Sequence, residues 1–226
     1  MSELPEIKAI DRIQENILAR SERRLLNWLC ARLPASVTPD RLTSVGMIGS
    51  VLIFVGYFAS NLDRNWLWLS IAAFFVQWFG DSLDGSLARW RKIERPRYGY
   101  FLDHSCDALA TTLIVGGIGL SPYVDFGAAL FALAGYLLMS IHAFLAARVL
   151  GELRLSYLAF GPTELRFVLI GITLVMYFGG IPEPVVKEAS WLDLFVGGAG
   201  VFMVILFVVQ TTAKVRLLAA QEPPRR

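Results

Sequence analysis

Long, nearly uninterrupted runs of apolar residues are the feature that most limits what this chain can fold into. They include Leu113–Leu120, Phe126–Leu138 and Leu194–Val209. About 20 mostly apolar residues in a helix match the thickness of the hydrocarbon core of a bilayer. Charged residues make up 18% of the chain, whereas a typical soluble domain carries about 25%. These runs predict an all-α membrane protein.

Six segments are long and apolar enough to be membrane spans. We expect them at roughly residues 42–60, 66–88, 100–119, 125–147, 165–180 and 191–211. The connections between them are short and no internal repeat is visible. The pattern predicts one six-span domain over residues 37–226, preceded by a juxtamembrane segment at 1–36.

The juxtamembrane segment has apolar residues at helical spacing between charged ones: Ile10, Ile13, Ile17, Leu25, Trp28 and Leu29. An amphipathic helix lying on the cytoplasmic membrane surface has this pattern. A helix packed against the bundle or against a partner protein is the alternative interpretation.

The distribution of positive charge predicts the orientation in the membrane. If the N-terminus is cytoplasmic, all of the 21 Lys and Arg residues except Arg64 and Lys187 lie in cytoplasmic segments. Cytoplasmic loops of membrane proteins carry such an excess of Lys and Arg. We therefore expect a multi-pass protein of a bacterial cytoplasmic membrane. The net charge of +2 is too small to favour a nucleic-acid partner.

Four aspartates interrupt the second and third predicted spans: Asp81, Asp84, Asp103 and Asp107. An Asp in the middle of a membrane helix costs about 2.5–3.5 kcal/mol on insertion scales, and ionisable residues within spans are by default functional. The members of each pair are three or four residues apart and so share one helix face. Both pairs are predicted to meet near the cytoplasmic boundary.

The chemistry of these side chains favours a hard divalent cation. Four converging carboxylates repel one another unless cations lie between them, and oxygen ligands select Mg²⁺ or Mn²⁺. His104 and His142 are isolated from each other in the sequence, so no zinc site is expected. Magnesium bound by carboxylates usually shares its coordination sphere with substrate phosphates. The residues therefore predict a two-metal phosphoryl-transfer site that faces the cytoplasm.

The aspartates belong to a longer pattern in the stretch DSLDGSLARWRKIERPRYGYFLDHSCD. Its spacing is Asp81-x2-Asp84-Gly85-x2-Ala88-Arg89-x9-Gly99-x3-Asp103-x3-Asp107. This stretch resembles the signature of the CDP-alcohol phosphotransferase family, with all eight signature residues present. The resemblance implies a six-helix core with an N-terminal surface helix.

The resemblance also implies roles for the signature residues. Asp81, Asp84 and Asp103 would be the main metal ligands, and Asp107 the catalytic base and a contact of the second metal. The CDP nucleotide would be bound by Asp84, Gly85, Ala88, Arg89 and Gly99. From the residues alone, Gly85 and Ala88 also suit close helix packing, and Arg89 also suits a cytoplasmic span end. The implied reaction is Mg²⁺-dependent transfer of a substituted phosphate from a CDP-alcohol to a hydroxyl, with release of CMP, in phospholipid biosynthesis.

Two branches of the family remain open as interpretations. The run DHSCD at 103–107 is similar to choline and ethanolamine phosphotransferases, which pass a phosphobase to diacylglycerol. So is VTPDRLTSVG at 37–46, although Asp40 stands where these relatives usually have Asn. The other branch uses CDP-diacylglycerol and a small alcohol. Four polar residues are weak candidates for an acceptor site or mark only the cytoplasmic face: Arg148, Arg154, Glu164 and Arg166.

Other classes fit the sequence less well. A prenyltransferase would need a second acidic motif downstream, where only Asp193 occurs. A divalent-cation transporter would place its carboxylates near the middle of the membrane, often on repeats. A catalytically inactive scaffold would not need the intact signature. Small-residue pairs such as Gly197 and Gly198 are compatible with a homodimer.

Overall fold

The computed structural model describes residues 11–13, 19–150, 152–154 and 161–222. Its helices are α1 (Ala19–Cys30), α2 (Pro39–Ala59), α3 (Leu67–Trp90), α4 (Pro96–Gly119), α5 (Phe126–Leu150), α6 (Pro162–Gly179) and α7 (Trp191–Gln221), with a short 3-10 helix at Arg64–Trp66. Strand β1 (Asp11–Ile13) pairs in parallel with β2 (Glu152–Arg154), and β3 (Pro184–Val186) pairs antiparallel with β4 (Ala189–Ser190). The predicted all-α class is confirmed.

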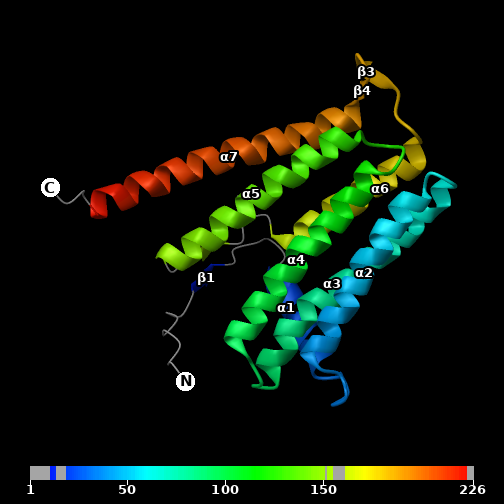
Figure 1. The fold of residues 1–226 in the computed structure, drawn as a ribbon. Coiled ribbons are helices and arrows are strands. Elements are labelled where there is room, and N and C mark those ends of the chain that lie inside the picture. Colours follow the sequence, from blue (N-terminus) through cyan, green and yellow to red (C-terminus); the bar gives the residue numbers. More distant parts are fainter. Residues whose placement is uncertain (1–10, 14–18, 151, 155–160, 223–226) are drawn as a thin grey trace.

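The long helices form a bundle in which each predicted span has a counterpart (Figure 1). Helix α2 packs against both α3 and α4, α4 contacts α5, and α5 contacts α7. Helix α7 runs well past the predicted end of its span, which we expected near residue 211. The other boundaries differ from the predicted ones by four residues or fewer.

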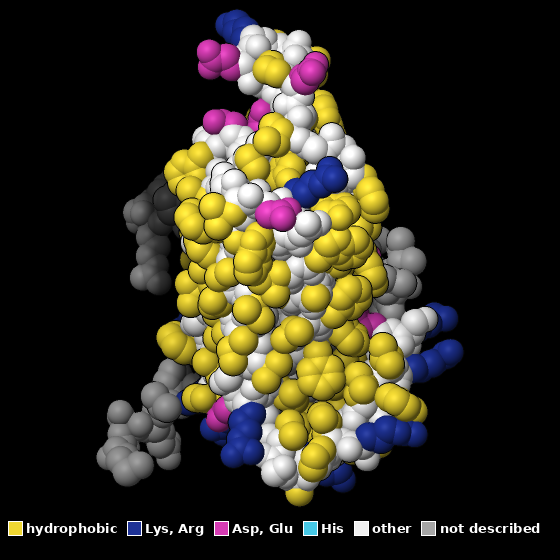
Figure 2. Space-filling model, turned by 90° about the vertical axis from the view of Figure 1, so that its right-hand side faces the viewer, with side chains coloured by type: hydrophobic (Ala, Val, Ile, Leu, Met, Phe, Trp, Pro, Cys, Tyr) yellow, Lys and Arg dark blue, Asp and Glu magenta, His cyan; other side chains and the backbone are white. Residues whose placement is uncertain are grey.

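Within the described residues, four helices are long and apolar enough to cross a membrane: α2, α5, α6 and α7. Together with the hydrophobic surface between the ends of the molecule (Figure 2), they establish a membrane protein. Helices α3 and α4 are 24 residues each, about 36 Å at the rise of an α-helix. They carry the four aspartates, and their status as the fifth and sixth spans stays a prediction.

The N-terminal segment differs from the helix that we expected. Residues 11–13 form strand β1, and the helix begins only at Ala19; Ile10 and Ile17 lie outside the described residues. Leu26 and Cys30 of α1 are buried in a cluster with Leu83 and Leu87 of α3. One face of α1 therefore packs against the bundle, as the alternative interpretation expected. Contact of its opposite face with the membrane stays a prediction.

Local sequence signals explain where several helices begin. Thr38 caps α2 through a hydrogen bond from the Arg41 backbone N–H, and Pro39 follows at the first helical position. Helix α7 begins with a capping box in which Ser190 and Asp193 bond to each other's backbone N–H groups. Asp193 also accepts the Asp125 backbone N–H at 2.6 Å. This carboxylate caps the start of α7 at the other end of the bundle, away from the four signature aspartates.

Glycines allow α2 and α3 to approach each other closely. A Cβ atom on Gly80 would clash with the backbone of Gly46 and lie 2.5 Å from the carbonyl oxygen of Leu42. A Cβ on Gly49 would lie 2.6 Å from the backbone nitrogen of Gln77. Small residues at helix interfaces are the usual means of such close packing in membranes. The contact fixes the part of α3 that carries Asp81 against α2.

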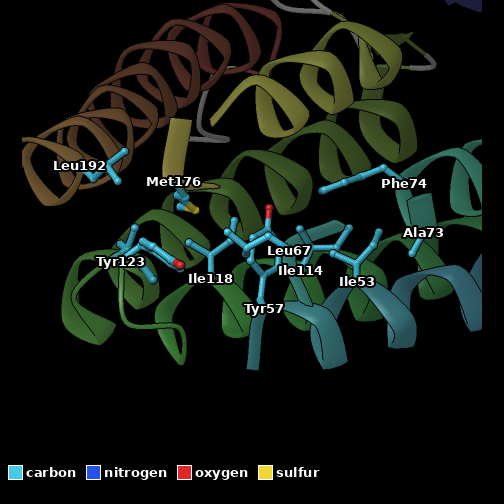
Figure 3. Close-up of a cluster of buried hydrophobic side chains, with 12 residues drawn as sticks. Ile53, Tyr57, Leu67, Ala73, Phe74, Ile114, Ile118, Tyr123, Met176 and Leu192 are labelled. Atoms are coloured by element: carbon cyan, nitrogen blue, oxygen red, sulfur yellow. The ribbon is translucent and has the colours of Figure 1, made fainter. Parts of the chain in front are cut away.

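The main hydrophobic core lies toward the opposite end of the bundle. Figure 3 shows Tyr57 of α2 near Ile114 and Ile118 of α4, in one buried cluster that also contains Ile53 of α2 and Met176 of α6. The Tyr57 hydroxyl also hydrogen-bonds the hydroxyl of Thr173 in α6 at 2.5 Å. This core ties α2, α3, α4, α6 and α7 together and leaves the other end of the bundle for polar side chains.

Replacing Gly80 by Ala tests the close contact of α2 and α3. The added methyl group would meet backbone atoms that cannot move aside, so we expect Gly80→Ala to destabilise the protein by about 1–3 kcal/mol. Thermal unfolding in detergent would measure the loss. Gly171→Ala in α6 is the matched control, because its Cβ would meet nothing within 4 Å. Equal stability of Gly80→Ala and the parent protein would contradict the packing.

Candidate metal and nucleotide site

The predicted metal ligands come from two helices joined by a short turn. Asp81 and Asp84 lie in the last three turns of α3, and Asp103 and Asp107 lie about two and three turns after the start of α4. A cavity of about 10 Å³ between α2, α3 and α4 is lined by Asp81, Asp84 and Asp103. Its volume is that of about one water-sized particle. The structure thus places three of the four aspartates around one ion-sized space.

Asp107 lies just outside the lining of this cavity, on the same face of α4 as Asp103. Ligand atoms of Asp103, His104 and Asp107 all lie within 4.8 Å of one another. The charges of Asp84, Asp103 and Asp107 all act on Asp81. The four carboxylates therefore form one electrostatic group, as the spacing predicts.

His104 lies beside this group, although it was not among the predicted site residues. Its Nδ1 is 3.8 Å from a carboxylate oxygen of Asp103 and 3.7 Å from one of Asp107. The ring is buried between Tyr100 and Phe144, with centroid distances of 4.3 and 4.8 Å. Within the described residues, Nε2 has no hydrogen-bond partner. Its position next to Asp103 in the sequence is the feature from which its place at the site could have been predicted.

Thr43 of α2 holds one of the aspartates in place. Its hydroxyl donates to Oδ2 of Asp84 at 2.6 Å, and the backbone N–H of Gly85 donates to Oδ1. Both carboxylate oxygens are thus oriented by the chain. Thr43 was not among the predicted site residues, although it lies in the segment 37–46 that is similar to choline and ethanolamine phosphotransferases.

Arg166 of α6 also reaches the site. Its guanidinium donates to Oδ2 of Asp81 and, through Nε, to the side-chain oxygen of Gln77 at 2.6 Å. The Arg166 side chain is only 12% exposed. This weak acceptor candidate is therefore placed directly against Asp81, one of the predicted metal ligands.

The other acceptor candidates are placed differently. Glu164 is buried and accepts the Gly161 backbone N–H at 3.0 Å, which caps the start of α6. Arg148 is exposed near the end of α5. The side chain of Arg154 lies outside the described part of the structure. Glu164 and Arg166 thus lie together at the start of α6, and Arg148 lies on another helix.

The predicted nucleotide-binding residues follow Asp84 on α3 and precede Asp103 on α4. A Cβ on Gly99 would meet nothing within 4 Å, so the surface beside it is open. A Cβ on Gly85 would lie 3.3 Å from Nη1 of Arg89. Ala88 lies between Gly85 and Arg89 on α3 and is half-buried. The guanidinium of Arg89 is thus folded back over the small residues of α3, where it can turn toward an anionic group.

These observations fit a divalent cation. The donors around the cavity are carboxylate oxygens, which suit Mg²⁺ or Mn²⁺ better than softer metals. Mutual repulsion of the carboxylates is relieved when cations bind between them. The arrangement lies next to an open surface, so a phosphate-bearing ligand could complete the coordination of an ion.

Comparisons with known proteins agree with this chemistry. Residues 36–212 match the family model described as CDP-alcohol phosphatidyltransferase. The chain is 39% identical to a phosphatidylinositol phosphate synthase of Cutibacterium acnes, over 40% of this chain and 41% of that protein. It is 32% identical to a cholinephosphotransferase 1 of Danio rerio, over 42% of this chain and 28% of the relative. A CDP-diacylglycerol–serine O-phosphatidyltransferase of Encephalitozoon cuniculi is 36% identical over 42% of this chain and 28% of its own length.

The aligned regions span less than half of each of these three relatives. The family match, in contrast, covers most of the present chain and includes every signature aspartate. It begins within the connection between α1 and α2 and ends within α7. The chain therefore belongs to the CDP-alcohol phosphatidyltransferase family.

Proposed function

We propose that this protein transfers a substituted phosphate group from a CDP-alcohol to a hydroxyl acceptor, releases CMP and acts in phospholipid biosynthesis. One observation carries the proposal: the four signature carboxylates lie close together beside an ion-sized cavity, next to the open surface at Gly99. The family match supports the same reaction class. The names of the relatives, which include synthases and phosphotransferases of phospholipids, point the same way.

We assign Asp81, Asp84, Asp103 and Asp107 as ligands of two Mg²⁺ or Mn²⁺ ions. Bound there, the ions would neutralise the diphosphate of the donor while its bond to CMP breaks. The chain's own contribution is orientation. Thr43 and the Gly85 N–H hold the two oxygens of Asp84, so this carboxylate would not have to reorganise on binding.

Asp107 is the proposed general base. Its side chain is 44% exposed, against 24% for Asp81, so an acceptor hydroxyl can approach it more readily. Asp107 would take the proton of that hydroxyl as its oxygen attacks the phosphorus nearer the alcohol of the donor. Gly85, Ala88, Arg89 and Gly99 would hold the nucleotide, with Arg89 directed at the diphosphate.

The donor and acceptor are proposed at the level of two branches. The DHSCD run and the Thr43 segment support transfer of a phosphobase from a CDP-base to diacylglycerol. The relative of Encephalitozoon cuniculi is named for the other branch, in which CDP-diacylglycerol is the donor. Arg166 is engaged by Asp81 and Gln77, so it would have to turn to hold a phosphorylated acceptor. This engagement slightly favours the CDP-base branch.

We further propose that α3 and α4 complete a six-span domain over residues 37–226. The N-terminus and the active site would face the cytoplasm of a bacterium. The support is the charge distribution: most Lys and Arg side chains on the face in Figure 2 gather toward the lower end. Exposed Leu25 and Trp28 on α1 support contact of this helix with the membrane surface. A homodimer remains part of the proposal, with Gly198 facing open space.

The role of Thr43 can be tested by metal binding. Thr43→Val removes the hydroxyl that orients Asp84 but keeps the side-chain shape, and we expect it to weaken Mn²⁺ binding about 10- to 100-fold. Calorimetry or Mn²⁺ electron paramagnetic resonance would measure the affinity. Thr112→Val is the matched control, because Thr112 bonds only its own helix, to Ala108. Unchanged affinity in Thr43→Val would contradict the role of this hydroxyl.

The reaction itself can be tested with purified protein in lipid. CDP-choline, CDP-ethanolamine and CDP-diacylglycerol would each be combined with diacylglycerol, glycerol phosphate, serine and inositol phosphate, and CMP release followed. We expect CMP from one pair, and its loss with EDTA and in Asp107→Asn by a factor of about 100 or more. Glu183→Gln is the control for removal of a carboxylate charge, because Glu183 is exposed in the connection between α6 and α7.

The outcomes separate the branches. CMP from a CDP-base with diacylglycerol would establish the first branch, and CMP from CDP-diacylglycerol with a small alcohol the second. No CMP from any pair, together with no Mg²⁺-dependent binding of CDP-alcohols, would rule out the proposed function.

A further inference from the structure

Helix α6 has few fully buried side chains, although Leu169, Ile170, Ile172 and Tyr177 are partly buried against the apolar core. Its buried residues are Thr163, Glu164, Thr173 and Met176. At its far end, Thr173 is fixed by the hydroxyl of Tyr57. At its start, near the aspartates, the contacts to other helices are polar. The position of this start therefore depends on individual hydrogen bonds more than on apolar packing.

One of these bonds comes from the N-terminal helix. Oε1 of Glu22 in α1 accepts the hydroxyl of Thr163 at 2.6 Å and the indole N–H of Trp78 at 2.9 Å. The hydroxyl of Ser82 lies at 3.5 Å from the same oxygen. Thr163 opens α6, whereas Trp78 and Ser82 lie on α3 on either side of Asp81. A single carboxylate oxygen thus joins three helices next to the metal ligands.

Helix α1 is a firm support for this carboxylate. Its buried residues Leu26 and Cys30 pack against α3. The connection from α1 to α2 is held by the guanidinium of Arg91, which donates to the carbonyl oxygens of Leu33, Pro34 and Val37 at 3.1, 2.9 and 2.5 Å. Movement of Glu22 away from α3 would require these contacts to break.

We propose that Glu22 is a positioning residue of the active site. It ties the first turn of α6 to α3 and so holds Arg166, one turn further along α6, against Asp81. Arg166 then contacts Asp81 and Gln77 from a fixed helix. The inference rests on the proposed function, because it assigns α6 to the acceptor side of that reaction. Glu22 lies outside the residues that match the family, 36–212.

The chemistry explains why a carboxylate is suited to this place. An ionised acceptor forms stronger hydrogen bonds than a neutral one, and it can take several donors at once. The donors come from a partly buried site where water competes less. Loss of the carboxylate leaves the Thr163 hydroxyl and the Trp78 indole without this acceptor. We therefore expect the start of α6 to move more freely over α3.

Two variants at one position separate positioning from folding. Glu22→Ala removes the acceptor, whereas Glu22→Gln keeps an oxygen in the same place. Arg24→Ala, an exposed residue of the same helix, controls for a general effect on α1. We expect Glu22→Ala to lower kcat/KM for the acceptor about tenfold, the factor for loss of about one hydrogen bond to a charged group. Affinity for Mn²⁺ and for the CDP-alcohol should change less than about twofold, and Glu22→Gln should restore most of the activity.

A structural readout makes the test independent of catalysis. Spin labels at Phe167 of α6 and Leu109 of α4, both more than half exposed, would report the distance between the helices after Cys30 and Cys106 are replaced by Ala. We expect a narrow distance distribution in the parent, in Glu22→Gln and in Arg24→Ala. Glu22→Ala should broaden it. Thr163→Val should broaden it as well and add nothing to Glu22→Ala, because both remove the same bond.

Each outcome decides the inference. A distribution in Glu22→Ala as narrow as in the parent would overturn it, whatever the kinetics. A broadened distribution with unchanged acceptor kinetics, or an equal loss of donor and acceptor binding, would overturn it too. If the parent protein released no CMP with any substrate pair, the proposed function would fail. The distance distributions would then still show whether Glu22 positions α6.

Discussion

Mutual repulsion of four carboxylates at one end of an apolar bundle is the constraint on which the rest of this structure depends. The charges of Asp84, Asp103 and Asp107 act on Asp81, and those of Asp103 and Asp107 act on Asp84. Hydrogen-bond donors of the surrounding chain orient individual carboxylate oxygens. Thr43 and the Gly85 N–H hold Asp84, and Arg166 holds Asp81. The remaining negative charge is what divalent cations would neutralise.

The helices are joined by different kinds of contact at the two ends of the bundle. The apolar core around Tyr57 and Met176 joins the helices away from the aspartates. At the end with the aspartates, the helices are joined by the close contact of Gly80 with α2 and by the hydrogen bonds of Glu22 and Arg166. The N-terminal helix, which could be regarded as an accessory, becomes part of the site through Glu22.

Features that repeat locally could be predicted from the sequence. The apolar runs marked every long helix to within a few residues except the end of α7, which continues as a helix beyond its apolar run. The spacing of the aspartates predicted that each pair shares a face. The segment before the first span was less predictable: its apolar residues indicated a longer helix, whereas the described part has strand β1 and a helix from Ala19. Pairing with β2 is a contact across the chain that helical spacing does not encode.

Contacts between distant residues could not be predicted, because nothing in one sequence links their positions. Thr43 and Asp84 are 41 residues apart, and Glu22 and Thr163 are 141 apart. Arg166 was considered for an acceptor, but its bond to Asp81 required the packing of α6 on α3. From the sequence, His104 is isolated from His142, and neither was predicted to bind a metal. The structure places His104 beside the aspartates that flank it on α4.

The central claim is that the four aspartates hold divalent cations for a CDP-linked donor. The most direct measurement is a titration of the purified protein with Mn²⁺, followed by electron paramagnetic resonance, with and without CDP-choline or CDP-diacylglycerol. We predict two bound ions per chain with magnetic coupling between them, binding that tightens with the donor, and loss of both ions in Asp103→Asn. Absence of Mn²⁺ binding in the parent protein, or equal binding in Asp103→Asn, would contradict the account.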